Sequence, residues 1–298
     1  MRIIDVHCYP NTKEWIACQR PYVDALAKYW KREWAAKTED EVVKDFTDAG
    51  VEAILVALDL ETTVHTPPCS NDFVSGVQKR HPGRIIQAWA AVDPFKGEEA
   101  IREARHAIRD LGMLGFHFHP IMGHFAVNDR RLYPLFEAIN ELNVPVMIDV
   151  GTTGMGAGMP GGMGARIRHA HPSALDELAA DFPHLTIIAA HIGWPWVEET
   201  TAVVLHKGNV YWELSGYAPK YFPEQLVKDV RGRLKDKILF GSDYPSMPYE
   251  RLLREWDELG YSDEIKERIF CRNAERVLNL PKSSAAGRAA TSSRKEAD

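Results

Sequence analysis

Histidine and aspartate residues follow short apolar runs at five separate points in this sequence of 298 residues. Imidazole and carboxylate groups bind divalent metal ions, and they also accept and donate protons during catalysis. The residues concerned are Asp5, His7, His117, His119, Asp149, His191 and Asp243. One such residue alone is often structural, but five such places in one chain indicate an active site that uses metal or acid–base chemistry.

His191 shows the pattern most clearly. It follows the apolar run Thr186-Ile-Ile-Ala-Ala190, and a turn, Gly193-Trp-Pro195, comes after it. A continuous apolar run is typical of a buried parallel strand. Enzymes with α/β folds place catalytic groups at the carboxyl ends of such strands, so this position favours a catalytic role for His191.

Eight short apolar segments alternate with amphipathic segments along the chain. The expected strands are residues 3–7, 52–57, 84–92, 113–118, 144–149, 185–190, 209–214 and 237–240. The expected helices are residues 41–46, 73–80, 98–110, 132–142, 174–181, 197–205, 223–230, 249–259 and 263–278. This order predicts a single-domain α/β fold, a (β/α)₈ TIM barrel. A doubly wound open sheet is the alternative, although Cys8-Tyr-Pro10 replaces its usual Gly-rich first turn.

The polar residues named above lie where a barrel of this type has its active site, at the C-terminal ends of the strands. Side chains alternate along a strand, so residues two positions apart face the same side. We therefore expect Asp5, His7 and Tyr9 to share one face, and His117 and His119 to share another. If these faces line the barrel, imidazoles and carboxylates converge at its mouth.

The barrel is expected to span residues 1–280. Residues 11–38 form an aromatic-rich insertion that we interpret as a lid or a dimer surface. Residues 281–298 have the polar, small-residue composition of a disordered tail. Residues 151–164 contain seven Gly, three Met and no charged residue, which predicts a flexible connector or a mobile lid.

The overall composition excludes several classes of protein. With 45% hydrophobic and 26% charged residues, the chain is an ordinary globular protein, and its net charge of −6 argues against nucleic-acid binding. No apolar stretch approaches the roughly 18–20 residues of a membrane helix, and the N-terminus has no signal-peptide core. The four cysteines are far apart and lack a CxxC spacing, so we expect free thiols in the cytoplasm.

At these residues the sequence resembles the amidohydrolase superfamily. The matching motifs are Ile4-Asp-Val-His7, Gly115-Phe-His-Phe-His-Pro120, His191-Ile-Gly-Trp-Pro195, Gly241-Ser-Asp-Tyr-Pro245 and Asn273-Ala-Glu-Arg-Val277. The chain looks most like the branch that contains aminocarboxymuconate-semialdehyde decarboxylase and γ-resorcylate decarboxylase. Residues 119–128 and 150–164 are similar to a narrower group, the 4-hydroxyphenyl-β-ketoacyl-CoA hydrolases.

The resemblance implies one divalent metal ion, with Asp5, His7, Asp149 and Asp243 as its ligands. Two positions depart from the branch. Tyr9 breaks the His-x-His motif of the first strand, and Asp149 replaces the usual histidine of the fifth strand. So many carboxylates favour a hard ion such as Mn²⁺ or Mg²⁺ over Zn²⁺. A site without a metal ion is the alternative.

The resemblance also implies a hydrolase that cleaves a C–C bond next to a carbonyl group, in an aryl β-ketoacyl thioester or a related aromatic compound. Asp243 would take a proton from metal-bound water, and His191 would polarise the carbonyl group or transfer a proton. His117 and His119 would protonate the leaving enolate. The alternative reaction is non-oxidative decarboxylation of an aromatic or enoic acid. A degenerate barrel that binds a ligand without turnover is the second alternative.

Four further residues are expected to bind the substrate. Tyr9, Trp194 and Tyr244 come just after strand ends and are placed to wall an aromatic ring. Arg166 is placed to hold an anionic group such as a phosphate of coenzyme A, with a solvated helix start as the alternative. The expected partners are a small-molecule substrate, such as a CoA thioester, and a second copy of the chain in a homodimer.

Overall fold

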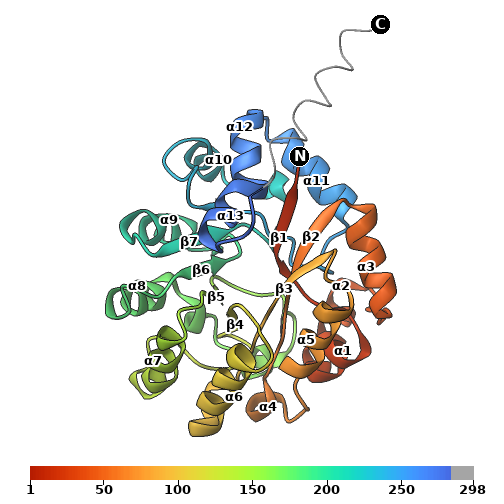
Figure 1. The fold of residues 1–298 in the computed structure, drawn as a ribbon, viewed down its shortest axis with the longest axis vertical. Helices are drawn as coiled ribbons and strands as arrows, with labels where there is room; N and C mark the ends of the chain where they lie inside the picture. Colours follow the sequence, from red (N-terminus) through yellow and green to blue (C-terminus); the bar gives the residue numbers. More distant parts are fainter. Residues whose placement is uncertain (283–298) are drawn as a thin grey trace, which may run out of the picture.

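The computed structural model describes residues 1–282 and contains eight parallel strands (Figure 1). The strands are β1 (Ile3–Cys8), β2 (Val51–Val56), β3 (Ile85–Trp89), β4 (Phe116–Phe118), β5 (Val146–Asp149), β6 (Ile187–Ala190), β7 (Val210–Glu213) and β8 (Ile238–Leu239). Each overlaps one of the eight segments expected from the apolar runs. The predicted tail, residues 281–298, lies outside the described residues except for Pro281 and Lys282.

The strands close into a barrel. Strands β1 to β3 form one sheet and strands β4 to β8 another, each in sequence order. At one seam between the sheets, Ala90 pairs with Phe116, and the backbone N–H of His117 donates to the Ala90 carbonyl at 2.8 Å. At the other seam, Cys8 pairs with Tyr244. The TIM-barrel prediction is therefore confirmed.

Helices surround the barrel and cover the outer faces of the strands (Figure 1). Those of the expected pattern are α3 (Glu39–Asp48), α5 (Asn71–Arg80), α6 (Glu98–Arg109), α7 (Tyr133–Glu141), α8 (Pro172–Asp181), α9 (Val197–His206), α10 (Glu224–Arg231) and α11 (Tyr249–Glu258). In α6, Ala100, Ala104 and Ala107 recur at helical spacing and are buried, which places one apolar stripe against the strands.

The last predicted helix, residues 263–278, is divided in the structure. Helix α12 (Asp263–Glu267) and helix α13 (Asn273–Val277) flank a π-helical turn, Arg268–Arg272. Short 3₁₀ turns occur at Pro94–Lys96, Arg130–Leu132, Pro160–Gly164, Ile167–Ala170 and Pro219–Tyr221. Helix α4 (Glu61–Val64) follows β2 and was not expected from the sequence.

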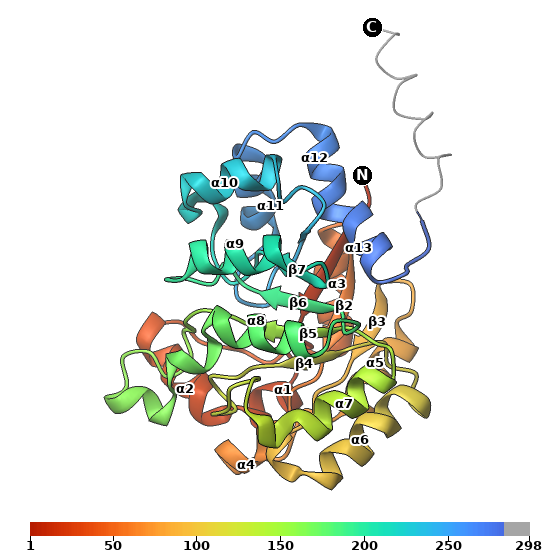
Figure 2. The same cartoon turned by 90° about the vertical axis from the view of Figure 1, so that its left-hand side faces the viewer.

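The aromatic-rich insertion after β1 contains α1 (Lys13–Cys18) and α2 (Arg20–Trp30). Trp15 and Tyr22 are buried there, because the insertion packs onto the end of the barrel rather than standing free. Figure 2 shows α2 beside the segment that follows β5. A Cβ atom at Gly158 of that segment would lie 2.5 Å from the Tyr29 ring of α2, so the segment and α2 are in direct contact.

Within residues 1–282, no helix is both long and apolar enough to cross a membrane. The four cysteines, Cys8, Cys18, Cys69 and Cys271, are buried and form no disulfide, as their spacing predicts.

Candidate active site

Asp149, the last residue of β5, is the centre of the histidine cluster. Its Oδ1 lies 3.0 Å from His117 Nε2, and its Oδ2 lies 3.3 Å from His119 Nε2 and 3.4 Å from His191 Nε2. His117 and His119 reach the same carboxylate because they are two residues apart, as strand alternation predicts. Three imidazoles thus converge on one buried carboxylate: His117 lies in β4, His119 directly after β4, and His191 directly after β6.

Two residues at the end of β7 orient the rings of this cluster. Glu213 Oε1 lies 2.8 Å from His7 Nδ1, and Ser215 Oγ lies 2.9 Å from His191 Nδ1. The Ser215 hydroxyl also donates to Glu213 at 2.9 Å, so one carboxylate positions both histidines. Neither Glu213 nor Ser215 was predicted from the sequence as a site residue. The signal was present, since Glu213 ends an apolar strand just as Asp149 does.

Asp243 follows β8 and faces His7. The distance from Asp243 Oδ1 to His7 Nε2 is 3.9 Å, and the Asp243 backbone N–H donates to the His7 carbonyl at 3.0 Å. Ser246 Oγ donates to Asp243 Oδ2 at 2.8 Å. One carboxylate oxygen is thereby fixed, and the other faces the cluster.

Two glycines allow this close packing. A Cβ atom at Gly216, whose φ is +72°, would lie 2.6 Å from His191 Nδ1. A Cβ atom at Gly241 would overlap the carboxylate of Glu213. Bare backbone at these two glycines therefore lies directly against the His191 ring and the Glu213 carboxylate.

The environment sets opposite protonation states on neighbouring histidines. Burial disfavours the charged form of His191, but the carboxylates of Asp149, Asp243 and Glu213 outweigh it and raise the pKa to about 10. Burial dominates at His119 and lowers its pKa to about 4. At neutral pH and without a bound cation, the cluster therefore favours the imidazolium form of His191 and the neutral form of His119.

The cluster also fits a divalent cation. His7 Nε2 and Asp149 Oδ2 are buried, and neither makes a hydrogen bond of good geometry among the described residues, although His119 Nε2 and His191 Nε2 lie 3.3 and 3.4 Å from Asp149 Oδ2. These side chains and His191 offer ligand atoms that all lie within 4.8 Å of one another. Buried polar atoms without a partner are rare in folded proteins, and imidazole nitrogen with carboxylate oxygen suits Zn²⁺ or Mn²⁺.

Asp5 does not belong to this group, and its prediction as a metal ligand is corrected. Its Oδ1 accepts the backbone N–H groups of His7 and Ser242 at 3.1 and 3.0 Å. Its Oδ2 accepts the Tyr249 hydroxyl at 2.7 Å. The register of β1 shifts between Asp5 and Cys8, so simple alternation does not hold there. Asp5 joins β1 to the segment after β8.

A small cavity adjoins the cluster. Its volume is about 50 Å³, far below the roughly 300–1,000 Å³ of typical ligand pockets. Four of its lining residues belong to the cluster, and we call them the floor: His119, Asp149, His191 and Asp243. We call the remaining lining residues the roof: Tyr9, Trp15, Gln19, Trp34, Met122, Thr153, Met155 and Ser246. An aromatic substrate therefore requires the roof to move.

Of the four predicted substrate-binding residues, Tyr9 lines this cavity. Trp194 is 51% exposed and lines a separate surface cavity, so it does not wall the site. Arg166 is exposed and is not among the lining residues. Tyr244 donates its hydroxyl to Asp45 at 2.6 Å, which turns it away from Asp149. The predictions for Trp194, Arg166 and Tyr244 are corrected accordingly.

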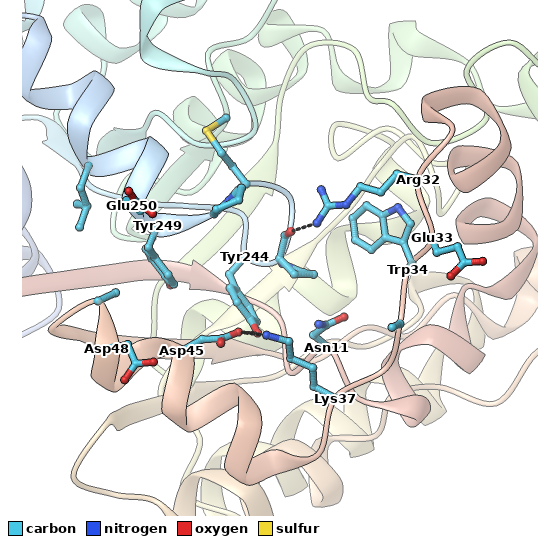
Figure 3. Close-up of a pocket in the computed structure, with 16 residues that line it drawn as sticks. Asn11, Arg32, Glu33, Trp34, Lys37, Asp45, Asp48, Tyr244, Tyr249 and Glu250 are labelled. Carbon is cyan, nitrogen blue, oxygen red and sulfur yellow. Dashed lines mark hydrogen bonds and ion pairs between the residues drawn. The ribbon is translucent and has the colours of Figure 1, made fainter.

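Tyr244 instead lines an outer cavity of about 730 Å³, shown in Figure 3. Trp34 borders both this outer cavity and the small cavity beside the cluster, which we call the inner cavity. Arg32 donates to the carbonyl oxygen of Ser246 at 3.1 Å, which ties the insertion to the loop after β8. The segment around Trp34 is thus the partition between the two cavities.

The sequence profile of the amidohydrolase family matches residues 4–280. The chain belongs to the amidohydrolase family. The membership agrees with a barrel whose strand ends carry histidines and aspartates. Comparison with curated proteins gives no match.

Several solved structures share this amidohydrolase fold. An uncharacterized TIM-barrel protein from Bordetella bronchiseptica is 23% identical, with a TM-score of 0.75 over 94% of this chain and 99% of that chain. The 5-carboxyvanillate decarboxylase from Sphingomonas paucimobilis is 16% identical, with a TM-score of 0.67 over 94% and 99%. A dihydroxybenzoic acid decarboxylase from Polaromonas sp. JS666, with bound manganese and 2-nitroresorcinol, is 19% identical, with a TM-score of 0.67 over 95% and 98%.

Proposed function

We propose that this amidohydrolase is a metal-dependent, non-oxidative decarboxylase that acts on an aromatic or enoic acid. The position of His191 carries the proposal. Decarboxylation at an unsaturated carbon needs a proton donor at that carbon, and His191 lines the cavity floor with its Nε2 3.4 Å from Asp149 Oδ2 and its Nδ1 held by Ser215. Support also comes from the fold, since the carboxyvanillate and dihydroxybenzoic acid enzymes similar to this chain are decarboxylases.

In the proposed reaction, His191 Nε2 gives its proton to the carbon that carries the carboxylate. The bond between that carbon and the carboxylate then breaks, its electron pair returns to the unsaturated system, and CO₂ leaves. Ser215 holds Nδ1 of His191 during this step, so that Nε2 stays on the side of Asp149. The neutral His119 beside it cannot compete as an acid at neutral pH.

The proposed metal ligands are His7, Asp149 and Asp243. His7 offers an unpartnered Nε2 that Glu213 orients through Nδ1, which is a common arrangement for a histidine ligand. A bound divalent cation would neutralise and orient the carboxylate or phenolate of the substrate. Crystals of similar proteins contain manganese, which supports a hard ion at this mixed nitrogen and oxygen site.

The hydrolase reaction that the sequence favoured uses the same residues but is less well supported. A CoA thioester would need cations for its phosphates, and no lysine or arginine within residues 1–282 lines the inner cavity. Arg166, the predicted phosphate ligand, is not among the residues that line this cavity. We therefore place decarboxylation first.

The test is to incubate the Mn²⁺-loaded protein with 2,6-dihydroxybenzoate and 5-carboxyvanillate and to measure CO₂ and the decarboxylated phenol by chromatography. Replacing His191 by Asn should reduce kcat by about 10²- to 10⁴-fold, the usual contribution of a general acid. The same variant should keep its bound metal. His184→Asn, at an exposed histidine outside the cluster, is the matched control and should retain full activity.

Three results would contradict the proposal. Full activity in His191→Asn would show that His191 is not the proton donor. Loss of metal from that variant would show that His191 is a metal ligand. Release of an acid from an ester or lactone without CO₂ would favour the hydrolase. Tight ligand binding with no turnover of any kind would favour the degenerate barrel.

A further inference from the structure

Two indole N–H groups in the roof have no hydrogen-bond partner. Nε1 of Trp15 and Nε1 of Trp34 are both buried, and neither meets an acceptor among the described residues. Buried tryptophans usually find a partner for this group. An indole N–H can only donate, so nothing but an acceptor atom can satisfy it. Both rings line the inner cavity.

The two rings are held in place from several sides. The Trp15 and Trp34 ring centroids are 6.0 Å apart, and Tyr9 packs against Trp15 at 5.1 Å. The Arg32 guanidinium lies 5.2 Å from the Trp34 ring (Figure 3), and it also donates to the Ser246 carbonyl. The rings therefore cannot turn freely to find water, and a ligand reaches the two buried N–H groups when the roof moves to admit it.

A third tryptophan shows what is specific about this pair. Trp256 Nε1 is also buried without a partner, but its ring packs in the core against Phe222, Phe240 and Phe270. Trp256 borders none of the cavities described above. An unpartnered indole alone is therefore not a binding feature, whereas two of them on the wall of the cavity that contains Asp149 and His191 are.

We propose that Trp15 and Trp34 bind the substrate by donating their indole N–H groups to an acceptor oxygen of a small planar acid. The oxygen is a carboxylate oxygen on the roof side, while the reacting carbon that carries the carboxylate faces His191 on the floor. This inference rests on the proposed function for the class of substrate, an unsaturated acid. It adds two specificity-determining residues from the insertion to the strand-end residues of the floor.

The experiment uses metal-loaded, full-length protein and two probes that differ by one carboxylate, 2,6-dihydroxybenzoate and resorcinol. Calorimetry gives the affinity for each probe, and the ¹⁵N–¹H indole resonances, with Zn²⁺ as the diamagnetic ion, report on each tryptophan. The variants are Trp15→Phe and Trp34→Phe, which keep an aromatic ring but lose the donor. Trp256→Phe is the matched control, because it loses an unpartnered donor outside the cavity.

We expect 2,6-dihydroxybenzoate to shift the indole resonances of Trp15 and Trp34 but not that of Trp256. Each cavity variant should bind 2,6-dihydroxybenzoate about tenfold more weakly, as for a hydrogen bond to a charged group, and resorcinol less than about twofold more weakly. Trp256→Phe should bind both as the wild type does. Equal losses for both probes would assign the rings to packing alone and overturn the inference.

Further outcomes separate the inference from the proposed function. If 2,6-dihydroxybenzoate is decarboxylated but shifts neither indole resonance, the function stands and the inference fails. If no aromatic acid binds but formate shifts both resonances, the inference stands and the function fails. If neither aromatic acids nor formate shifts them, the inference fails.

Discussion

Replacing Asp149 by Asn should return the pKa of His191 close to its ordinary value. Asp149 Oδ2 and His191 Nε2 are 3.4 Å apart, and the two side chains are only 5% and 15% exposed. With an effective dielectric constant of about 20, one charge pair at this distance is worth about 5 kcal/mol, or roughly 3–4 pKa units. The wild-type pKa is about 10, so the variant should titrate near pH 6–7.

The assay is an NMR titration of histidine ring resonances in protein stripped of metal by chelation. His191 should remain an imidazolium ion through pH 8 in the wild type, because Asp149 and the other carboxylates hold the proton. In Asp149→Asn the ring should be mostly neutral at pH 8. Ser215→Ala is the control, since it removes a hydrogen bond to His191 but no charge, and it should shift the pKa by less than about one unit.

Either of two results would refute this reasoning. A wild-type His191 that titrates near pH 6.5 would mean that burial outweighs the carboxylates. An unchanged high pKa in Asp149→Asn would mean that other groups hold the proton, and Asp243 and Glu213 would be the next residues to replace.

Three further predictions follow from neighbouring contacts. Asp5→Asn should keep its full metal content, measured by mass spectrometry, but lose roughly 1–3 kcal/mol for each weakened bond in denaturant unfolding, because its oxygens accept three buried hydrogen bonds. Loss of metal from this variant would show that Asp5 is a metal ligand. Gly216→Ala should lower both kcat and Tm, since its Cβ would lie 2.6 Å from His191 Nδ1. An active, stable variant would show that the backbone at Gly216 can move away from His191. His191 has a folded pKa of about 10 against 6.5 unfolded, so it contributes about 4–5 kcal/mol that is fully present below pH 6.5. The free energy of unfolding of metal-free protein should therefore fall as pH rises from 7 through 10, and a constant value would contradict the shift.

The barrel could be predicted because every strand is buried on both faces and therefore appears as an apolar run. The run before His191 became β6, and the run before Asp149 became β5, each within two residues of the expected start. The same property located the floor, since residues that follow such runs lie at one end of the barrel.

Side-chain direction could not be predicted where the backbone departs from regular geometry. Asp5 was expected beside His7, but the register shift in β1 turns it to Tyr249 and Ser242. Glu213 was overlooked because the expected strand, residues 209–214, placed this carboxylate inside the strand, whereas β7 ends at Glu213. The unpartnered donors of Trp15 and Trp34 depend on how the insertion packs, which no local pattern in the sequence encodes.

The separation of floor and roof has a consequence for how this enzyme can diversify. The floor comes from strand ends whose rings rest against bare backbone at Gly216, so few substitutions there leave the proton chemistry intact. Five of the eight roof residues come from the insertion and from the segment after β5. Among them, Gln19, Thr153 and Met155 make no described hydrogen bond to the histidine cluster. Selection for a new substrate can therefore act on the roof while the floor is inherited unchanged. Relatives that share this floor but differ in the roof would perform the same bond cleavage on different acids.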